Sequence, residues 1–139
     1  MATVSTRSDV LAKVVKWLAH PEIDYHFDVV TLNVASTATL PIGTVLAKVT
    51  STGKYLVQDS TLSTGAGLEA AGILIGTDLE NTGVSAVAAT DVSVLMLARG
   101  PARVAKGNLS MGAGTTTDAQ KLVVYNTLAG LGILADAVI

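Results

Sequence analysis

The chain has 139 residues, of which 50% are apolar, 14% charged and only 4% aromatic, with nine basic residues, eleven acidic residues and no cysteine. This length fits one domain with its own core, and the apolar content argues against a disordered chain. A net charge of −2 with no basic stripe argues against nucleic-acid binding, and the lack of cysteine excludes disulfides and thiolate metal sites.

The apolar residues are mostly Ala, Val and Leu, and the mean hydropathy is +0.54. Such a composition predicts more apolar surface than one small core can cover, which is typical of chains that contact another chain. We therefore expect an oligomer or a component of an assembly. The N-terminus has no apolar stretch behind a basic start, so we expect no secretory signal. No stretch is long enough to span a membrane, and Asp136 interrupts the apolar C-terminal run.

The N-terminal segment begins with a small polar stretch, which we expect to be a mobile arm, and continues as SDVLAKVVKWLAH. Its apolar residues recur at helical spacing, Ser8 is a suitable N-cap and Pro21 ends the pattern, which predicts an amphipathic helix over residues 8–19. A helix this short needs a partner surface, either its own domain or a neighbour. Trp17 is its one large anchor, and both roles, core residue and docking residue, remain open.

Short strands and turns follow an extended connector that starts at Pro21. β-Branched residues predict a strand over 28–34, residues 35–39 form a loop, and Pro41 with Gly43 sets a turn. A hairpin comes next, with strands over 44–50 and 54–57 joined by a turn at Gly53.

The second half of the chain predicts two long strands and one helix. After a polar loop over 59–67, we expect strands over 69–75 and 90–100. Pro101 ends or bulges the second strand, and residues 103–104 are its expected continuation. Thr117 and Gln120 form a capping box that opens a helix from Asp118 to about Leu128. Gly130 is its expected left-handed cap, and 133–139 is a closing strand. This order predicts a mainly β small barrel or sandwich with a late α-helix.

No group of residues predicts an active site. His20 and His26 with Glu22 and Asp24 are too far apart along an extended segment to bind one metal ion, so we expect solvated side chains. The acidic turn at 78–81 lacks the spacing of a calcium loop, and the glycines at 65 and 67 lack that of a nucleotide-binding loop. Residues 99–102 fit a strand-ending turn with an exposed Arg as well as they fit a catalytic loop. We expect no cofactor and no catalytic residue.

The pieces VVTLNV, LPIGTVLAKVTSTGKYLV, AAGILI, ARGPARV and AGLGI occur in one order along residues 28–135. In that order they resemble the head decoration proteins of tailed bacteriophages, of the lambda protein D type. Ala47 stands where the family commonly has Gly. The predicted helix over 8–19 is a second departure, because the arm of the lambda-type protein is flexible until it meets the capsid.

The resemblance implies a β-clip-like fold and a homotrimer that binds the outer surface of an icosahedral capsid at its three-fold sites. It also implies that an N-terminal arm, residues 1–27, adds to the sheet of the major capsid protein, while residues 28–139 form one decoration domain. The protein would then stabilise the expanded, DNA-filled shell in the virion, without nucleic acid or membrane as partners. On this basis we predict that the capsid-binding residues are Val10, Val14, Trp17, Leu18, Tyr25 and Phe27.

The alternative from another class is a surface-displayed glycan- or ligand-binding β-module. Few aromatic rings are available to stack on sugars, since Tyr55 and Tyr125 are the only ones beyond the N-terminal segment. An enzyme is the third possibility, and no convergent acid, base or nucleophile favours it.

Overall fold

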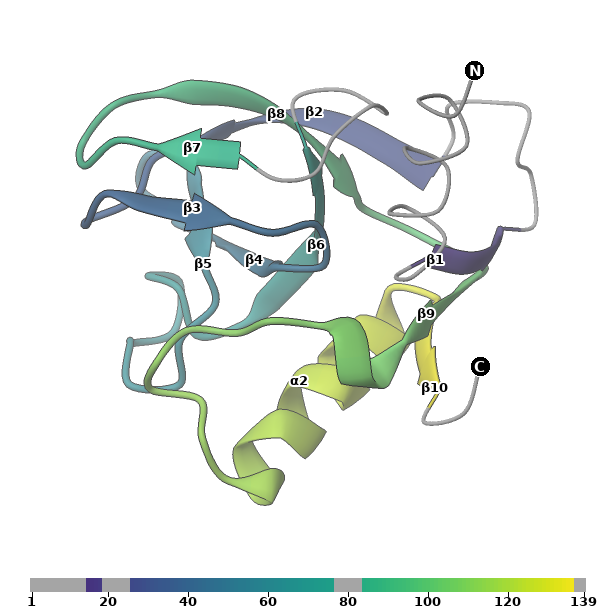
Figure 1. Ribbon diagram of the computed structural model, residues 1–139. Helices are drawn as coiled ribbons and strands as arrows, with labels where there is room; N and C mark the ends of the chain where they lie inside the picture. Colours follow the sequence, from purple (N-terminus) through teal and green to yellow (C-terminus); the bar gives the residue numbers. More distant parts are fainter. Residues whose placement is uncertain (1–14, 19–25, 77–83, 137–139) are drawn as a thin grey trace, which may run out of the picture.

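The computed structural model describes residues 15–18, 26–76 and 84–136. Five strands close a barrel in the order β2-β5-β4-β6-β8, and helix α2 (Asp118–Gly130) lies outside it (Figure 1). The barrel strands are β2 (Phe27–Leu32), β4 (Val45–Lys48), β5 (Tyr55–Val57), β6 (Ala70–Gly76) and β8 (Val92–Leu97). The prediction of a mainly β barrel with a late helix is therefore confirmed.

Strands β4, β6 and β8 separate two apolar cores. Side chains alternate between the two faces of a strand, so Ile73 of β6 joins one core while its neighbour Leu74 joins the other. The first core lies on the side of α2 and includes Val124 and Leu128 of that helix. The second collects the inward residues of the barrel, among them Met96. Burial on both faces explains why β6 reads as the nearly unbroken apolar run AAGILI.

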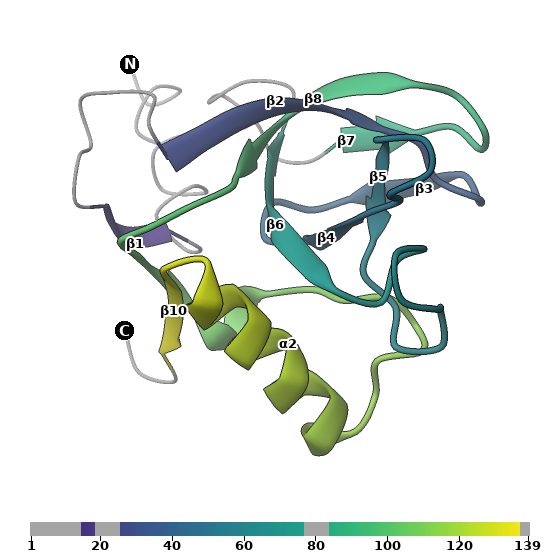
Figure 2. The ribbon, with the colours of Figure 1, turned by 180° about the vertical axis from the view of Figure 1, so that it is seen from behind.

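A two-stranded sheet of β3 (Ala38–Leu40) and β7 (Val84–Ala86) adds Leu40 and Val84 to the second core. In both Figure 1 and Figure 2 this pair lies on the side of the molecule away from β1. The sequence predicted a loop over 35–39, because the residues there are small and polar and only pairing with β7, some 45 positions later, makes 38–40 a strand.

A second sheet lies outside the barrel, next to the C-terminal end of α2 (Figures 1 and 2). Its order is β1-β9-β10, with β9 in the middle, antiparallel to β1 and parallel to β10. The strands are β1 (Val15–Leu18), β9 (Ala102–Ala105) and β10 (Ile133–Asp136). Ala102, Val104 and Ile133 are buried in the first core, which joins this sheet to α2 and to the barrel.

Strand β1 corrects the part of the predicted helix over residues 8–19 that the structure describes, residues 15–18. Residues 15–18 are extended, with Val15 opposite Val104 and Leu18 opposite Ala102, while the rest of the predicted helix lies outside the described residues. The spacing of the apolar residues is compatible with a helix. As a strand, however, residues 15–18 pair with the main chain of β9 and supply hydrogen-bond partners to that edge of β9. A lone helix of this length gains no comparable tertiary contact.

The hairpin of β4 and β5 and the first turn of α2 agree with the predictions made from the sequence. β4 and β5 pair antiparallel with Lys48 opposite Tyr55, and Gly53 takes the left-handed conformation that the turn requires. The Thr117–Gln120 capping box is present with both of its hydrogen bonds. The predicted left-handed cap at Gly130 is wrong, because α2 continues through that residue and Gly132 has the positive φ of +85°.

Gly100 and Gly132 meet where the chain passes from the barrel to the outer sheet. A Cβ placed on Gly100 would fall directly onto the carbonyl of Gly132, which is backbone and cannot swing aside. The main-chain N–H of Gly100 also donates to the carbonyl of Leu131 at 2.9 Å. The absence of a side chain at Gly100 therefore allows β9 to lie close to the turn that follows α2.

We predict that Gly100→Ala destabilises the fold by about 3 kcal/mol or more, because the added Cβ would clash with main-chain atoms of Gly132 and force the backbone to shift. Chemical denaturation followed by circular dichroism measures the change. Gly107→Ala is the control, since a Cβ there meets nothing within 4 Å and should change stability by less than about 0.5 kcal/mol. Equal denaturation midpoints for both variants and the parent protein would contradict the close approach of Gly100 to Gly132.

Candidate functional site

The described residues meet neither the requirements of a metal site nor those of a membrane-spanning helix. Within residues 15–18, 26–76 and 84–136, no three His, Asp or Glu side chains gather as a metal site would require. None of the helices described there has the length and apolar character needed to cross a membrane. The polar side chains that cluster in these residues connect one loop to another.

Thr115 lies at the centre of a buried polar cluster. Its hydroxyl donates to Oε1 of Gln58 at 2.9 Å and accepts from the main-chain N–H of Ser60 at 2.9 Å. The amide nitrogen of Gln58 donates to the carbonyl of Leu68 at 2.8 Å. Thr115 and Gln58 are almost fully buried, so these bonds are sheltered from water. The cluster ties the loop after β5 to the segment before α2.

Asp59 extends this cluster at the surface. Its carboxylate accepts from the hydroxyl and the main-chain N–H of Thr61 and from the N–H of Gly114. These bonds, above all the one from the Thr61 hydroxyl, hold the pKa of Asp59 below its ordinary value. The carboxylate thus organises the turn that it belongs to.

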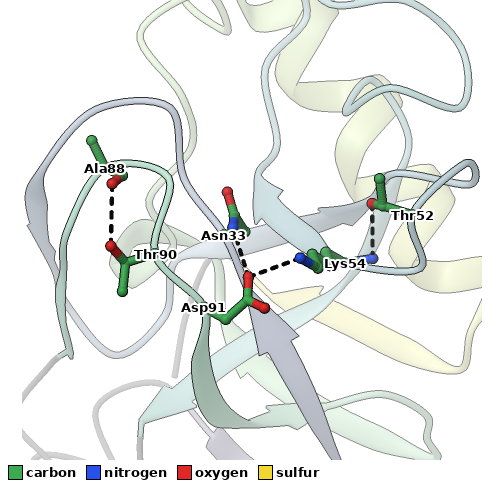
Figure 3. A network of polar contacts seen from close by, with 6 residues as sticks. All are labelled: Asn33, Thr52, Lys54, Ala88, Thr90 and Asp91. Carbon is green, nitrogen blue, oxygen red and sulfur yellow. Dashed lines mark hydrogen bonds and ion pairs between the residues drawn. The ribbon is translucent and has the colours of Figure 1, made fainter.

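A second polar network connects three segments at one end of the barrel (Figure 3). The side-chain amide of Asn33 donates to Oδ1 of Asp91 at 2.7 Å, and Nζ of Lys54 lies 3.0 Å from the same oxygen. The hydrogen bond from Asn33, followed by that from Lys54, lowers the pKa of Asp91. All three side chains lie at the surface, where such pairs contribute little energy. They link residues that follow β2 to those that precede β5 and β8.

His26 is buried, which corrects the prediction of a solvated side chain; His20 lies outside the described residues. Its Nδ1 is 3.0 Å from the carbonyl of Arg99 and must donate, because a carbonyl can only accept. Its own carbonyl accepts from the N–H groups of Ala98 and Arg99. The guanidinium of Arg99 is paired with Asp28 at 2.6 Å, so this Arg is not the freely exposed residue expected. His26 thereby positions the segment that leads into β9.

The six predicted contact residues are found in different places. Trp17 and Leu18 lie in β1, opposite Arg103 and Ala102 of β9. Phe27 begins β2 and is half-buried against the first core, so it belongs structurally to the barrel. The remaining predicted residues, Val10, Val14 and Tyr25, lie outside the described residues.

The outer sheet presents a partly apolar face beside β1. Leu134 of β10 is 45% exposed, although its neighbour Ile133 is fully buried. A shallow hollow of about 510 Å³ lies here, lined by Pro101, Ala102, Arg103, Gly132 and Leu134. This face belongs to the same sheet as β1, with β9 between β1 and β10.

Helix α2 presents a second apolar surface, which the sequence reasoning missed. Only Val124 and Leu128 of the helix are buried, while Leu122 is 55% and Val123 62% exposed. An open groove of about 790 Å³ runs beside the helix, lined by Lys106, Gly107, Leu109, Ser110, Met111, Thr115, Asp118, Lys121, Leu122 and Tyr125. The signal was the run LVVY over 122–125, since four consecutive helical residues cannot all face one core.

The two tyrosines of the domain are partly covered. Tyr55 packs against the second core, and the ammonium of Lys106 lies 4.7 Å from the ring centroid of Tyr125. Burial raises the pKa of both phenols. A stacking platform for sugar rings needs an open aromatic face, so neither residue favours the glycan-binding alternative.

Comparison with known proteins gives one family. The model described as "Bacteriophage lambda head decoration protein D" matches residues 6–133, which is nearly the whole chain. No curated protein matches the chain.

We predict that Thr115→Val lowers the free energy of unfolding by about 1–3 kcal/mol, because Gln58 and the N–H of Ser60 lose a buried partner. Thermal and chemical denaturation measure the loss. Thr116→Val is the matched control, as its exposed side chain should contribute less than about 0.5 kcal/mol. If both variants lowered the free energy of unfolding by the same amount, the buried cluster would stabilise the fold no more than an exposed threonine does.

Proposed function

The chain belongs to the bacteriophage lambda head decoration protein D family, and from this premise we propose that it is a cement protein of the phage head. Proteins of this family sit on the outer surface of the phage head in the virion. We propose that this chain binds the major capsid protein there as a homotrimer, at the three-fold sites, and stabilises the expanded shell around its DNA. The match over residues 6–133 is the observation that carries the proposal. A β-clip-like fold for the decoration domain is part of it.

The proposed binding element is the N-terminal arm, residues 1–27, with the decoration domain following over 28–139. The proposed contacts are Val10, Val14, Trp17, Leu18, Tyr25 and Phe27. The geometry of β1 supports a contact by strand addition. β1 is an outer strand of its sheet, and among the described strands it pairs with β9 alone. A strand from the capsid protein can extend a sheet at such an edge through main-chain hydrogen bonds.

Three copies would make even a weak arm effective. Once one arm of a trimer is bound, the other two are held near their sites, and the local concentration of each rises far above that in solution. A short strand with a few apolar side chains is sufficient under these conditions. Release would then require all three contacts to open together.

The arm can be shortened without removing any residue that the structure describes. A deletion of residues 1–27 removes β1 and the buried His26 along with the arm, whereas a deletion of 1–14 leaves every described residue in place. We predict that the 1–14 deletion changes stability by less than about 0.5 kcal/mol and weakens capsid binding at least tenfold. Co-sedimentation with purified expanded capsids measures the binding. Full decoration by the shortened protein would rule out Val10 and Val14 as necessary contacts and leave the binding to residues from 15 onward.

For Trp17→Ala we predict capsid binding at least tenfold weaker, equivalent to about 1.4 kcal/mol, with a stability change below about 1 kcal/mol. The reason is that a large aromatic anchor contributes most at a desolvated contact. Trp17→Phe should restore most of the binding. Val29→Ala is the surface control, because Val29 is 74% exposed on the barrel. A large loss of stability with normal binding would make Trp17 a core residue.

A further inference from the structure

The outer sheet is arranged in rows of three residues, one from each strand. Because β9 lies in the middle, each paired residue of β9 has one partner in β1 and one in β10. Residues that lie opposite each other on neighbouring strands belong to the same face of the sheet. The three rows are Val15 with Val104 and Ala135, Trp17 with Arg103 and Leu134, and Leu18 with Ala102 and Ile133.

The first and third of these rows lie on the face toward the first core. Residues of all three strands in these two rows are buried in that core or pack against it, namely Val15, Ala102, Val104, Ile133 and Ala135. The middle row lies on the opposite face, because successive residues of a strand alternate between faces. Arg103 is exposed there and Leu134 is 45% exposed, and both line the hollow of about 510 Å³.

A bulge in β1 brings Trp17 into the middle row. The register shifts between Val15 and Trp17, so Lys16 is an extra residue in β1 relative to β9. Val15 and Leu18, three positions apart, therefore both lie in core-facing rows, with the row of Trp17 between them. The same spacing of three is typical of a helix, which explains why the apolar pattern of this segment predicted one.

We propose that Trp17, Arg103 and Leu134, which we call the outer row, form one contact surface for the capsid protein. The capsid segment that binds there carries a carboxylate next to apolar side chains. This inference rests on the proposed function, in which Trp17 is already a contact, and it adds Arg103 and Leu134 to the binding site. It also narrows the contacts of β1 to Trp17, because Leu18 lies in a core-facing row.

The residue types of the outer row fit such a partner. Trp and Arg are enriched among the residues that carry most of the energy of protein contacts, and their neighbours exclude water from around them. A guanidinium binds a carboxylate through two parallel hydrogen bonds. Among the described residues that line the hollow, Arg103 is the one with an ionisable side chain, so an acidic group is complementary to it.

The position of the outer row also fits the proposed strand addition at β1. Neighbouring strands are roughly 4.8 Å apart, so the row extends about 10 Å across the sheet from Trp17 to Leu134. A capsid strand paired with the outer edge of β1 would lie at one end of this row. About three further extended residues would cross the row, at roughly 3.3 Å for each residue. One continuous capsid segment can therefore make both contacts.

The placement of Trp17 can be tested on the free protein. Trp17 is the only tryptophan of the chain, so intrinsic tryptophan fluorescence reports its surroundings directly. We expect acrylamide to quench this fluorescence readily in the folded protein. Blue-shifted emission that resists acrylamide would place Trp17 in the core and overturn the outer row, whether or not the protein binds capsids.

Capsid binding tests the two added residues. We expect Arg103→Ala and Leu134→Ala each to bind purified expanded capsids about tenfold more weakly in co-sedimentation, while circular dichroism shows melting temperatures close to that of the parent. Lys48→Ala and Leu62→Ala are the matched controls and should bind like the parent, because Lys48 is exposed on the barrel and Leu62 is 38% exposed in the loop after β5. Normal binding by the Arg103 and Leu134 variants would overturn the outer row.

Salt and charge reversal test the chemistry of the partner. Binding of the parent should weaken as sodium chloride is added, and binding of Arg103→Ala should weaken less, because the ion pair is already lost. Arg103→Glu should bind more weakly than Arg103→Ala. Equal salt dependence of the parent and Arg103→Ala would exclude the carboxylate. A parent that does not bind capsids at all overturns the proposed function itself, whereas failure of the outer row alone leaves the parent bound.

Discussion

The burial of β6 between two cores is the constraint on which the rest of the structure depends. Consecutive residues such as Ile73 and Leu74 point to opposite sides, so both sides must be covered with apolar groups. On one side the barrel closes and β3 with β7 adds to its core; on the other side α2 and the outer sheet are required. Removing either layer would expose a full face of β6 to water, at about 25 cal/mol for each Å² of apolar surface.

The outer sheet links this constraint to the proposed function. Its central strand β9 is held by buried residues below and by the close approach of Gly100 to Gly132 at its start. His26 fixes the segment before it through the carbonyl of Arg99. β1 pairs with β9, so these contacts also determine where the N-terminal strand leaves the domain. The arm is proposed to bind the capsid, and its point of attachment is thus built into the core.

The apolar composition is explained by surfaces as well as cores. The expectation of excess apolar surface is met by Leu122 and Val123 on α2 and by Leu134 on β10. Sequence reasoning predicted that such surface exists but placed the contacts in the N-terminal segment alone. Of that set, Trp17 and Leu18 are found on one strand of the body, and Phe27 is found in the barrel. The surface on α2 was missed because a helix with apolar residues on two sides does not reveal which side meets the core.

The sequence by itself determined the features that depend on neighbouring residues. The 44–57 hairpin follows from its alternation and from Gly53, the start of α2 from Thr117 and Gln120, and the strand β6 from its apolar run. The order of these local pieces also carried the family resemblance, which the match over residues 6–133 confirms. Only the tertiary structure decided that residues 15–18 form a strand, that 38–40 pair with 84–86, and that His26 is buried. Each of these depends on a partner 44 or more positions away. Local propensity contains no information about which distant backbone will supply the missing hydrogen bonds.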